Sequence, residues 1–318
     1  MTGAASRDRT LPQLEGGLFL TDGGIETTLI FHDGLDLPYF AAFDLLARDD
    51  GVAAVRRYYE PYVAVALEHG VGIVLESATW RASPDWAALL GHNADALAKL
   101  NRDAIELLVD VRERHATDRT PIVISGCVGP RGDGYAPSSR MHAAEAQAYH
   151  GVQIDTFGDT AADLVTAITM TYPDEAIGVT RAAEAAGLPV VIAFTVETDG
   201  RLPSGHTLAD AIDAVDRATG ARPAYYMVNC AHPTHFDAVF EPGGPWERVR
   251  GLRANASTLS HAELDEAEEL DDGDPVDLAA RYVGLRPHLP ELCVLGGCCG
   301  TDDRHIRAMA EAWRAEAR

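Results

Sequence analysis

The chain has 318 residues, 47% of them apolar, and its 49 acidic and 26 basic side chains leave a formal net charge of −23. This size and apolar content predict a globular core and exclude disorder as the main state. The negative charge repels phosphate backbones and anionic bilayers, so we expect no nucleic-acid partner and no membrane partner.

Short apolar runs rich in β-branched residues alternate with longer helical patterns along the chain. The eight predicted strands span residues 18–21, 72–75, 122–125, 164–169, 190–196, 225–229, 252–254 and 293–295. The predicted helices span residues 58–69, 94–115, 143–160, 174–186, 208–219, 276–286 and 304–316. A strand followed by a helix, repeated in this way, is the pattern of a (βα)8 barrel, the TIM barrel of the α/β class.

Two segments do not fit this repeat. Residues 129–140, rich in Gly, Pro and Ser, follow the third strand and predict a functional loop. Residues 260–274 carry HAELDEAEELDDGD and predict a solvated acidic insertion, with a Ca²⁺ loop as the alternative. No Pro/Gly/Ser-rich linker divides the chain, so we expect one domain over residues 12–318, preceded by a flexible N-terminus of residues 1–11.

Lysine content and the N-terminal sequence narrow the function further. The one lysine, Lys99, lies in a predicted helix. Schiff-base chemistry and a phosphate-binding P-loop are therefore not expected, because both need a placed lysine. The N-terminal MTGAASRDRT lacks the apolar core of a secretory signal, and no uninterrupted run of about 18 apolar residues follows, so we expect a cytoplasmic protein.

The five cysteines are Cys127, Cys230, Cys293, Cys298 and Cys299. An odd number of cysteines in a large chain of a reducing compartment makes a disulfide framework a poor explanation. Cys230 follows the sixth predicted strand, and Cys298 and Cys299 follow the eighth. In a closed barrel these strands are separated by one strand, so their C-terminal loops converge at the mouth where catalytic groups stand. Cys127 and Cys293 are assigned to packing.

Three thiolates converging on one point suit Zn²⁺, which binds sulfur at about 2.3 Å in a tetrahedron and keeps one position open when it is catalytic. Adjacent side chains on a strand point to opposite faces, so Cys298 and Cys299 share a metal only where the strand has ended, and the flanking glycines permit that turn. Alternatively, the cysteines are small buried residues, or Cys298 and Cys299 form a vicinal disulfide. A further alternative is a metal site containing His232, His235 or His305.

A zinc ion held by three thiolates carries a site charge of about −1, which makes it a weak Lewis acid toward water and a suitable host for a fourth thiolate. A free thiol, with a pKa of about 8.5, is mostly protonated at neutral pH, and metal coordination deprotonates it. The cluster therefore favours activation of a thiol substrate over hydrolysis.

Five segments carry a resemblance to a known family, namely TDGG at 21–24, ISGCVGP at 124–130, VNC at 228–230, RANAS at 253–257 and LGGCCGT at 295–301. In these segments the chain resembles the zinc-dependent homocysteine S-methyltransferase family, in order over nearly its whole length. The resemblance implies a (βα)8 barrel in which Cys230, Cys298 and Cys299 hold one Zn²⁺ per chain. It also implies that the metal binds the homocysteine thiolate, which receives a methyl group to give methionine.

The same resemblance assigns the substrate contacts. Asp22 and Gly23 belong to the first-strand motif, whose loop lies beside the amino acid, and Thr79 and Asn229 stand at later strand ends. An acidic group such as Asp22 can receive an α-ammonium group. The alternative is that Asp22 forms a turn ahead of two glycines.

Several positions depart from the family pattern. Met170 stands where the family commonly has a glutamate that contacts the homocysteine amine, Ser77-Ala78-Thr79 replaces a common Thr-Asn-Thr, and Glu26 takes the place of a usual small residue. Glu26 and Glu76 can supply a substitute negative charge, and Arg81 can clamp a carboxylate in a bidentate way. The alternative is a set of salt bridges at the rim of the barrel.

These features predict a zinc-dependent S-methyltransferase whose partners are a small thiol, L-homocysteine, and a methyl donor. The donor we expect is a sulfonium, S-methylmethionine or S-adenosylmethionine, because the sequence carries no added module for folate or cobalamin. Two alternatives stay open: a methyltransferase for a different thiol, and a zinc- and thiol-binding barrel without catalytic activity. The sequence predicts no oligomeric state.

Overall fold

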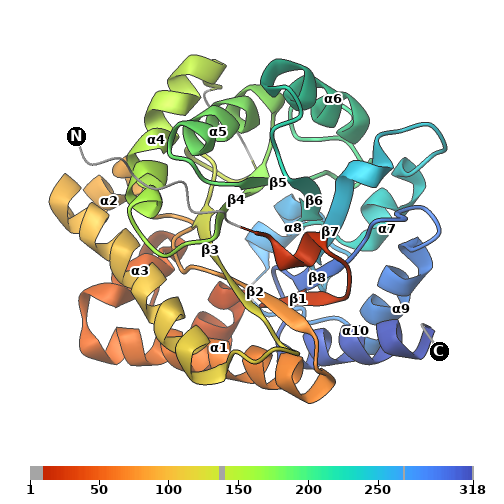
Figure 1. The fold of residues 1–318 in the computed structure, drawn as a ribbon, viewed down its shortest axis with the longest axis horizontal. Helices are drawn as coiled ribbons and strands as arrows, with labels where there is room; N and C mark the ends of the chain where they lie inside the picture. The colour runs from red at the N-terminus through yellow and green to blue at the C-terminus, as the bar shows by residue number, and fades with distance from the viewer. Residues whose placement is uncertain (1–9, 136–139, 268, 317–318) are drawn as a thin grey trace.

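The computed structural model describes residues 10–135, 140–267 and 269–316, and its eight parallel strands close into a barrel in sequence order (Figure 1). The strands are β1 (Phe19–Thr21), β2 (Gly72–Glu76), β3 (Ile122–Val128), β4 (Leu164–Met170), β5 (Val190–Phe194), β6 (Tyr225–Asn229), β7 (Val249–Ala254) and β8 (Val294–Gly297). Helices surround the strands on all sides (Figure 1). The predicted single-domain (βα)8 TIM barrel is confirmed.

The helices follow the strands in the predicted alternation. The α-helices are α1 (Asp49–His69), α2 (Pro84–Leu89), α3 (Ala94–His115), α4 (Ala143–Gly158), α5 (Pro173–Ala185), α6 (Leu208–Thr219), α7 (Pro233–Phe236), α8 (His261–Glu266), α9 (Pro275–Leu285) and α10 (Asp303–Glu316). A π-helix, η2 (Thr27–His32), and the 3₁₀ helices η1 (Pro12–Leu14), η3 (Pro38–Phe40), η4 (Ala42–Ala47), η5 (Asp237–Val239) and η6 (Trp246–Arg248) lie in the connections. None of the described helices is long and apolar enough to cross a membrane.

Helix α1 begins nine residues before its predicted start at Tyr58, because Gly51 and Pro61 weaken the helical pattern of the sequence. Gly51 is required by packing, since a Cβ atom there would lie 2.1 Å from the carbonyl oxygen of Leu45. The short helices α2, α7 and α8 were not predicted, because one or two turns carry too little periodic signal.

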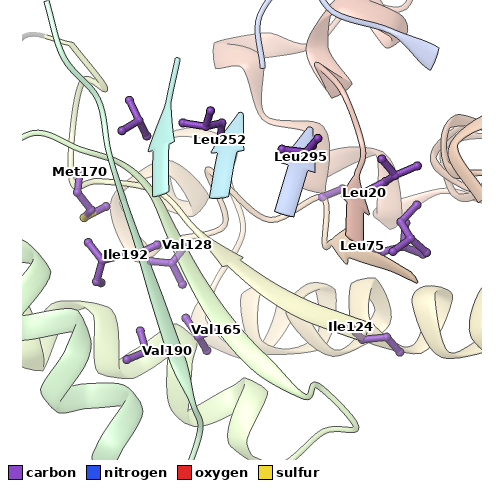
Figure 2. Close-up of a cluster of buried hydrophobic side chains, with 14 of the residues drawn as sticks. Leu20, Leu75, Ile124, Val128, Val165, Met170, Val190, Ile192, Leu252 and Leu295 are labelled. Atoms are coloured by element: carbon purple, nitrogen blue, oxygen red, sulfur yellow. The ribbon is translucent and has the colours of Figure 1, made fainter. Parts of the chain in front are cut away.

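Side chains alternate between the two faces of each strand and form two apolar clusters. The larger cluster packs between strands and helices and includes Leu20, Leu75, Ile124 and Ile192 (Figure 2). The smaller cluster takes the alternate strand positions, among them Phe19, Val74, Val123 and Val191, and therefore fills the inside of the barrel. Its members come mainly from the first half of each strand, so the amino-terminal end of the barrel is apolar.

The inside of the barrel becomes polar toward the carboxyl ends of the strands. Two residues beyond Val74 on the same face stands Glu76, and the equivalent inward positions on β3, β6 and β7 hold Ser125, Asn229 and Arg253. All four polar side chains are buried. The fold therefore presents a buried polar layer directly beneath the barrel mouth.

The segment that contains Leu11 and Gln13 packs against the apolar, amino-terminal end of the barrel. Residues 1–9 of the predicted flexible segment lie outside the described residues, whereas Leu11 is buried in the same cluster as Phe19.

Close packing around β8 makes Gly296 intolerant of any side chain. A Cβ atom at Gly296 would lie 1.7 Å from Thr21 Oγ1 on β1, so we expect Gly296→Ala to lower the free energy of unfolding by about 1–3 kcal/mol or more. Gly284→Ala on α9 is the control, since nothing lies within 4 Å of its added Cβ atom and alanine is the better helix former. Denaturant unfolding of both variants tests this, and equal stability of the two would contradict the packing described.

Candidate active site and metal centre

Three cysteines meet at the barrel mouth. Cys230 follows β6 directly, Cys298 and Cys299 follow β8, and the three Sγ atoms lie within 4.8 Å of one another. Cys230 is buried, whereas the other two are more exposed, so the cluster has one open side. Among the described residues this is the one group of three or more His, Cys, Asp or Glu side chains with metal-ligand spacing.

Backbone contacts turn these cysteines off their strands. Cys230 adopts a left-handed conformation (φ 53°), and its N–H donates to the carbonyl of Arg253 at 3.0 Å. The Cys298 N–H donates to the carbonyl of Ala254 at 2.8 Å, and the Cys299 N–H donates to Asn255 Oδ1 at 3.1 Å. Strand β8 ends at Gly297, so Cys298 and Cys299 lie beyond the strand and are not held to its alternating faces. This meets the condition under which two adjacent cysteines can share a metal.

In the structure Cys230 and Cys298 are joined as a disulfide across 68 positions of the sequence. The sequence argued against a disulfide framework, and this pair is the one disulfide among the described cysteines; the alternative vicinal Cys298–Cys299 bridge is not formed. Both states need the same proximity, because a site that brings thiolates together around a metal also brings two sulfurs into bonding range. A disulfide offers no thiolate, so metal binding needs the reduced pair.

The donor set of the reduced cluster fits zinc. Sulfur ligands of a tetrahedral zinc ion at about 2.3 Å lie roughly 3.8 Å apart, which is compatible with three Sγ atoms within 4.8 Å of one another. Three thiolates and one open side match the pattern of a catalytic rather than a closed structural site. Cys127 and Cys293 stand apart from the cluster, Cys127 within β3 and Cys293 just before β8, as predicted for packing residues.

Asn229 and Thr79, both predicted to contact substrate, are fully buried and occupied by other partners. Asn229 accepts from the Thr169 N–H at 2.8 Å and donates to Thr169 Oγ1 at 3.0 Å. Thr169 has a left-handed backbone (φ 63°), unusual for a β-branched residue, and its Oγ1 lies 3.8 Å from Cys230 Sγ. Thr79 donates to the Cys127 carbonyl at 2.7 Å. In this structure Asn229 positions Thr169 beside the cluster, and Thr79 braces β2 against β3.

Asp22 takes part in a buried ion pair. Arg253 Nη2 lies 2.8 Å from Asp22 Oδ1, and Tyr58 donates to Asp22 Oδ2 at 3.1 Å. Burial raises the pKa of Asp22, while Arg253 and Tyr58 oppose that rise. Arg253 Nη1 also lies 4.0 Å from Glu76 Oε1, where burial raises the pKa to about 7 against the lowering effect of Arg253. Asp22 is thus held by its neighbours rather than by a local turn.

Arg253 lies in the RANAS motif of residues 253–257, but its ion pairs were not foreseen from the sequence. The sequence did contain a signal for these ion pairs, namely an arginine at an inward position of a predicted strand. A buried arginine is rare without an acidic partner, so such a partner could have been expected. Gly23 is closely packed, since a Cβ atom there would lie 2.8 Å from Tyr62 Oη and 2.9 Å from the Thr301 carbonyl oxygen. The first-strand motif is therefore built directly against the loop that carries the cysteine pair.

Met170 lies in the apolar cluster between barrel and helices rather than at the mouth (Figure 2). It is fully buried and pairs with Phe194 across a register shift between β4 and β5. The residue of this strand end that reaches Cys230 is Thr169. The chain thus places no carboxylate on β4 next to the cysteines.

Glu26 and Arg81, the two charged departures from the family pattern, both lie near this site. Burial raises the pKa of Glu26 to about 7, which Arg81 and Arg253 oppose. Arg81 is 9% exposed and donates to the Gly132 carbonyl at 2.8 Å. No salt bridge joins Arg81 to a described acidic residue, so the alternative of rim salt bridges does not describe it.

The loop after β3, predicted as a functional loop over residues 129–140, reaches the cysteines through Tyr135; residues 136–139 lie outside the described residues. Tyr135 Oη lies 3.7 Å from Cys299 Sγ, and its ring stacks on His261 with centroids 4.1 Å apart. His261 Nε2 in turn lies 2.5 Å from the Cys230 carbonyl oxygen. Tyr135 and His261 were missed because their partners are set only by the tertiary fold: Tyr135 lies in a loop, and His261 begins the short helix α8.

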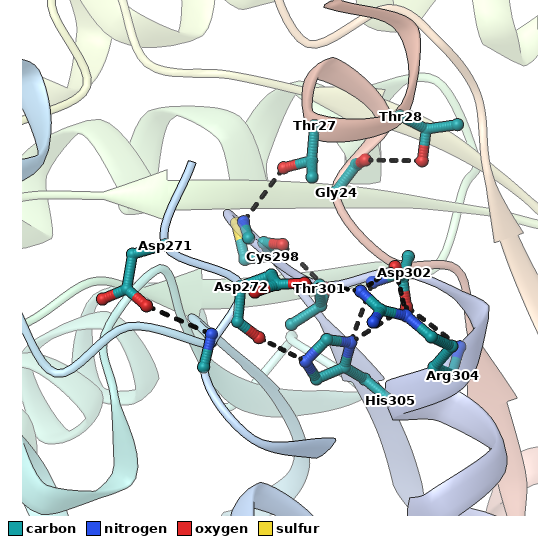
Figure 3. A network of polar contacts seen from close by, with 12 residues as sticks. Gly24, Thr27, Thr28, Asp271, Asp272, Cys298, Thr301, Asp302, Arg304 and His305 are labelled. Carbon is teal, nitrogen blue, oxygen red and sulfur yellow. Dashed lines mark hydrogen bonds and ion pairs between the residues drawn. The ribbon is translucent and has the colours of Figure 1, made fainter. Parts of the chain in front are cut away.

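A network of polar contacts fixes the turn after the cysteine pair (Figure 3). His305 is buried, with Nδ1 3.1 Å from Asp302 Oδ1 and Nε2 2.8 Å from the Asp272 carbonyl oxygen. Burial opposes ionisation of Asp302, but hydrogen bonds from His305 and Arg304 lower its pKa well below the usual range. This histidine is structural and does not form a metal site.

His232 and His235, the other members of the alternative metal site, also have structural contacts. His232 caps α7 through Thr234, and His235 Nε2 lies 2.9 Å from the Thr258 carbonyl oxygen. Their rings contact each other with centroids 6.2 Å apart. Neither histidine belongs to a group with metal-ligand spacing in the described part of the chain.

The acidic segment after β7 is largely exposed, and its later part also makes contacts within the protein. Glu263, Glu266 and Glu269 are exposed, as predicted. Asp271 accepts from Ser257 at 2.5 Å, and Asp274 caps the N-terminus of α9. The later part of the insertion therefore braces the mouth, which charge density alone did not reveal.

Comparisons with known proteins identify the family of the chain. The model of the homocysteine S-methyltransferase family matches residues 19–313, so the chain belongs to that family and is a methyltransferase acting on homocysteine. No curated protein matches the chain.

Two solved structures of the homocysteine methyltransferase MmuM from Escherichia coli share its fold. The oxidised form has a TM-score of 0.75 at 18% identity, covering 94% of this chain and 96% of that one. The metallated form has a TM-score of 0.75 at 17% identity, covering 96% and 99%.

The buried Arg253 cluster generates a prediction about stability. Arg253→Met leaves Asp22 and Glu76 without their cation, so we expect the free energy of unfolding to fall by about 3–5 kcal/mol at pH 8. Removing Arg253 raises both carboxyl pKa values further, so the folded state binds more protons than the unfolded state. Stability is then lost as pH rises from the ordinary glutamate value of 4.5 through about 7, and the loss should be smaller at pH 5.

The control is Arg307→Met, because Arg307 pairs with Glu68 at the surface and such pairs contribute at most about 1 kcal/mol. Denaturant unfolding at pH 5 and pH 8 measures both variants. A loss for Arg253→Met that is the same at both pH values would refute the electrostatic account.

Proposed function

We propose that the protein is a zinc-dependent methyltransferase that moves a methyl group from a sulfonium donor, S-methylmethionine or S-adenosylmethionine, to the thiol of L-homocysteine, forming methionine. Family membership supports the acceptor and the reaction. The observation that supports the metal is the convergence of Cys230, Cys298 and Cys299 within 4.8 Å on the open side of the barrel.

Zinc bound by these residues would hold the substrate sulfur as a thiolate at neutral pH, where a free thiol of pKa about 8.5 is mostly protonated. The chain's part is to hold the ligands. Contacts from Arg253 and Asn255 fix Cys230 and Cys299, and Thr169 lies against the Cys230 sulfur. Tyr135 and His261 cover one side of the cluster and limit the access of water.

The methyl transfer depends on the alignment of the reacting groups and requires no general acid or base. The thiolate sulfur forms a bond to the methyl carbon, the bond from that carbon to the donor sulfonium breaks, and its electron pair stays on the donor sulfur as a neutral thioether. No proton moves in this step, so the site requires alignment of the two sulfurs with the methyl group.

A second candidate is a methyltransferase for a different thiol acceptor. Met170 favours it, because a buried methionine stands where a carboxylate for the substrate amine was expected. The third possibility is a thiol-binding barrel without activity. It differs from the two enzymes in that it would form no methylated product.

The test is methionine formation from L-homocysteine and S-methylmethionine by reduced, zinc-loaded protein. We expect Cys298→Ala to abolish product and stoichiometric zinc, since two thiolates hold zinc far less well than three. Cys293→Ala is the matched control, because Cys293 lies at the other end of β8 and donates to the Gln13 carbonyl. It should keep both zinc and activity.

Each other outcome has a definite meaning. Wild-type protein that contains zinc but makes no methionine would contradict homocysteine or the sulfonium as substrate. Full zinc content in Cys298→Ala would contradict the ligand assignment. A reductant should be required for zinc uptake, because the Cys230–Cys298 disulfide withholds two ligands.

A further inference from the structure

Arg81 is a buried cation that forms no salt bridge with any described acidic residue; burial lowers its pKa, and the charges of Asp133 and Glu26 oppose that lowering. Its side chain follows β2 at the barrel mouth, is 9% exposed, and makes one hydrogen bond, from Nη1 to the Gly132 carbonyl. Its Nε–H has no acceptor. Arginine is rarely buried unless it is paired, so this guanidinium is incomplete as it stands.

Two tryptophans pack on the same guanidinium. The Arg81 Cζ atom lies 4.3 Å from the ring centroid of Trp80 and 4.0 Å from that of Trp86. The Nε1–H groups of both indoles are buried and also lack acceptors. Three neighbouring side chains thus hold N–H donors that no described residue accepts, which is the pattern expected of a site for an anion with several acceptor oxygens.

Glu26 provides the opposite charge nearby. Its charge and that of Arg81 influence each other, yet no side chain of the described residues donates to Glu26 or forms a salt bridge with it. By contrast, Asp22 and Glu76 both face Arg253. Asp22 and Glu76 are buried, whereas Glu26 is partly exposed and available to a cation.

Residues near Glu26 and Arg81 in the sequence connect both charged groups to the cysteine cluster. Glu26 lies between Gly24, whose added Cβ atom would be 2.6 Å from the Cys298 carbonyl oxygen, and Thr27, whose Oγ1 accepts from the Gly300 N–H at 2.9 Å. Glu26 therefore stands on the segment that packs against the cysteine turn.

On the Arg81 side, the contact with the cluster runs through Trp80. A Cβ atom at Gly134 would lie 3.1 Å from the Trp80 ring and 3.4 Å from Thr169 Cγ2, and Thr169 Oγ1 lies 3.8 Å from Cys230 Sγ. A ligand that accepts hydrogen bonds from the unpaired donors, and that also offers a cation to Glu26, would therefore lie close to the cysteine sulfurs.

We propose that Arg81, with Trp80 and Trp86, binds the α-carboxylate of the thiol substrate, and that Glu26 binds its α-ammonium group. The planar guanidinium suits a carboxylate, which can accept two parallel hydrogen bonds. The two groups select a zwitterionic amino-acid thiol over thiols that lack either charge. This inference rests on the proposed function, since it takes the substrate sulfur to lie at the cysteine cluster.

The test is calorimetric binding of three thiols to reduced, zinc-loaded protein in the absence of any methyl donor. The probes are L-homocysteine, 3-mercaptopropylamine, which lacks the carboxylate, and 4-mercaptobutyrate, which lacks the amine. Wild-type protein should bind L-homocysteine at least about 10-fold more tightly than either analogue.

The variants separate the two charges. Arg81→Gln should weaken L-homocysteine and 4-mercaptobutyrate by about 10- to 100-fold and leave 3-mercaptopropylamine unchanged. Glu26→Gln should weaken L-homocysteine and 3-mercaptopropylamine and leave 4-mercaptobutyrate unchanged. Arg131→Gln is the control, because Arg131 pairs with Asp85 and Glu145 at the surface, and it should bind all three thiols as wild type does.

Thermal unfolding without ligand provides a second readout. Since Arg81 is an unpaired buried cation in the free protein, Arg81→Gln should unfold at the same or a higher temperature, whereas a structural arginine would lose stability. Equal weakening of all three thiols in either variant, or no thiol binding by wild-type protein, would overturn the proposal. Selective binding without methyl transfer would uphold it and contradict the proposed function instead.

Discussion

The end of β7 is the constraint on which the site depends, because it lies between the two strands that deliver the cysteines. The carbonyl of Arg253 accepts from Cys230 on one side, and the carbonyl of Ala254 accepts from Cys298 on the other. The Arg253 side chain meanwhile pairs with Asp22 from β1 inside the barrel. One short strand end therefore fixes the separation of the sulfurs and joins it to the first-strand motif.

The charged residues at the barrel mouth fall into two groups, one that stabilises the barrel and one that is available to the substrate. Arg253 neutralises the buried carboxylates beneath the mouth and so belongs to the architecture of the barrel. Arg81 and Glu26 carry charges that the described protein leaves without partners. A substrate with a thiol, a carboxylate and an ammonium group complements the reduced cysteines and these two side chains together. The buried Met170 fits the same view, since recognition of the amine no longer needs β4.

The sequence predicted the barrel and the cysteine cluster because both depend on order along the chain. Alternating strands and helices define the barrel, and strand ends in a barrel must meet at its mouth. Contacts between distant side chains were harder to foresee. The left-handed Thr169, which turns β4 so that Met170 faces the helices, has no local sequence signal. Asn229 and Thr79 looked like substrate residues at strand ends, but their partners come from neighbouring strands and occupy them. The Cys230–Cys298 disulfide likewise depends on spatial proximity rather than on spacing.

The central claim is that Cys230, Cys298 and Cys299 together present an open zinc site to a thiol substrate. X-ray absorption at the zinc edge of reduced, zinc-loaded protein, recorded with and without L-homocysteine, tests it most directly. The account predicts three sulfur ligands and one lighter ligand in the free protein, and four sulfur ligands when the thiol is bound. Fewer than three sulfurs in the free protein, or a sulfur count that does not rise with L-homocysteine, would contradict it.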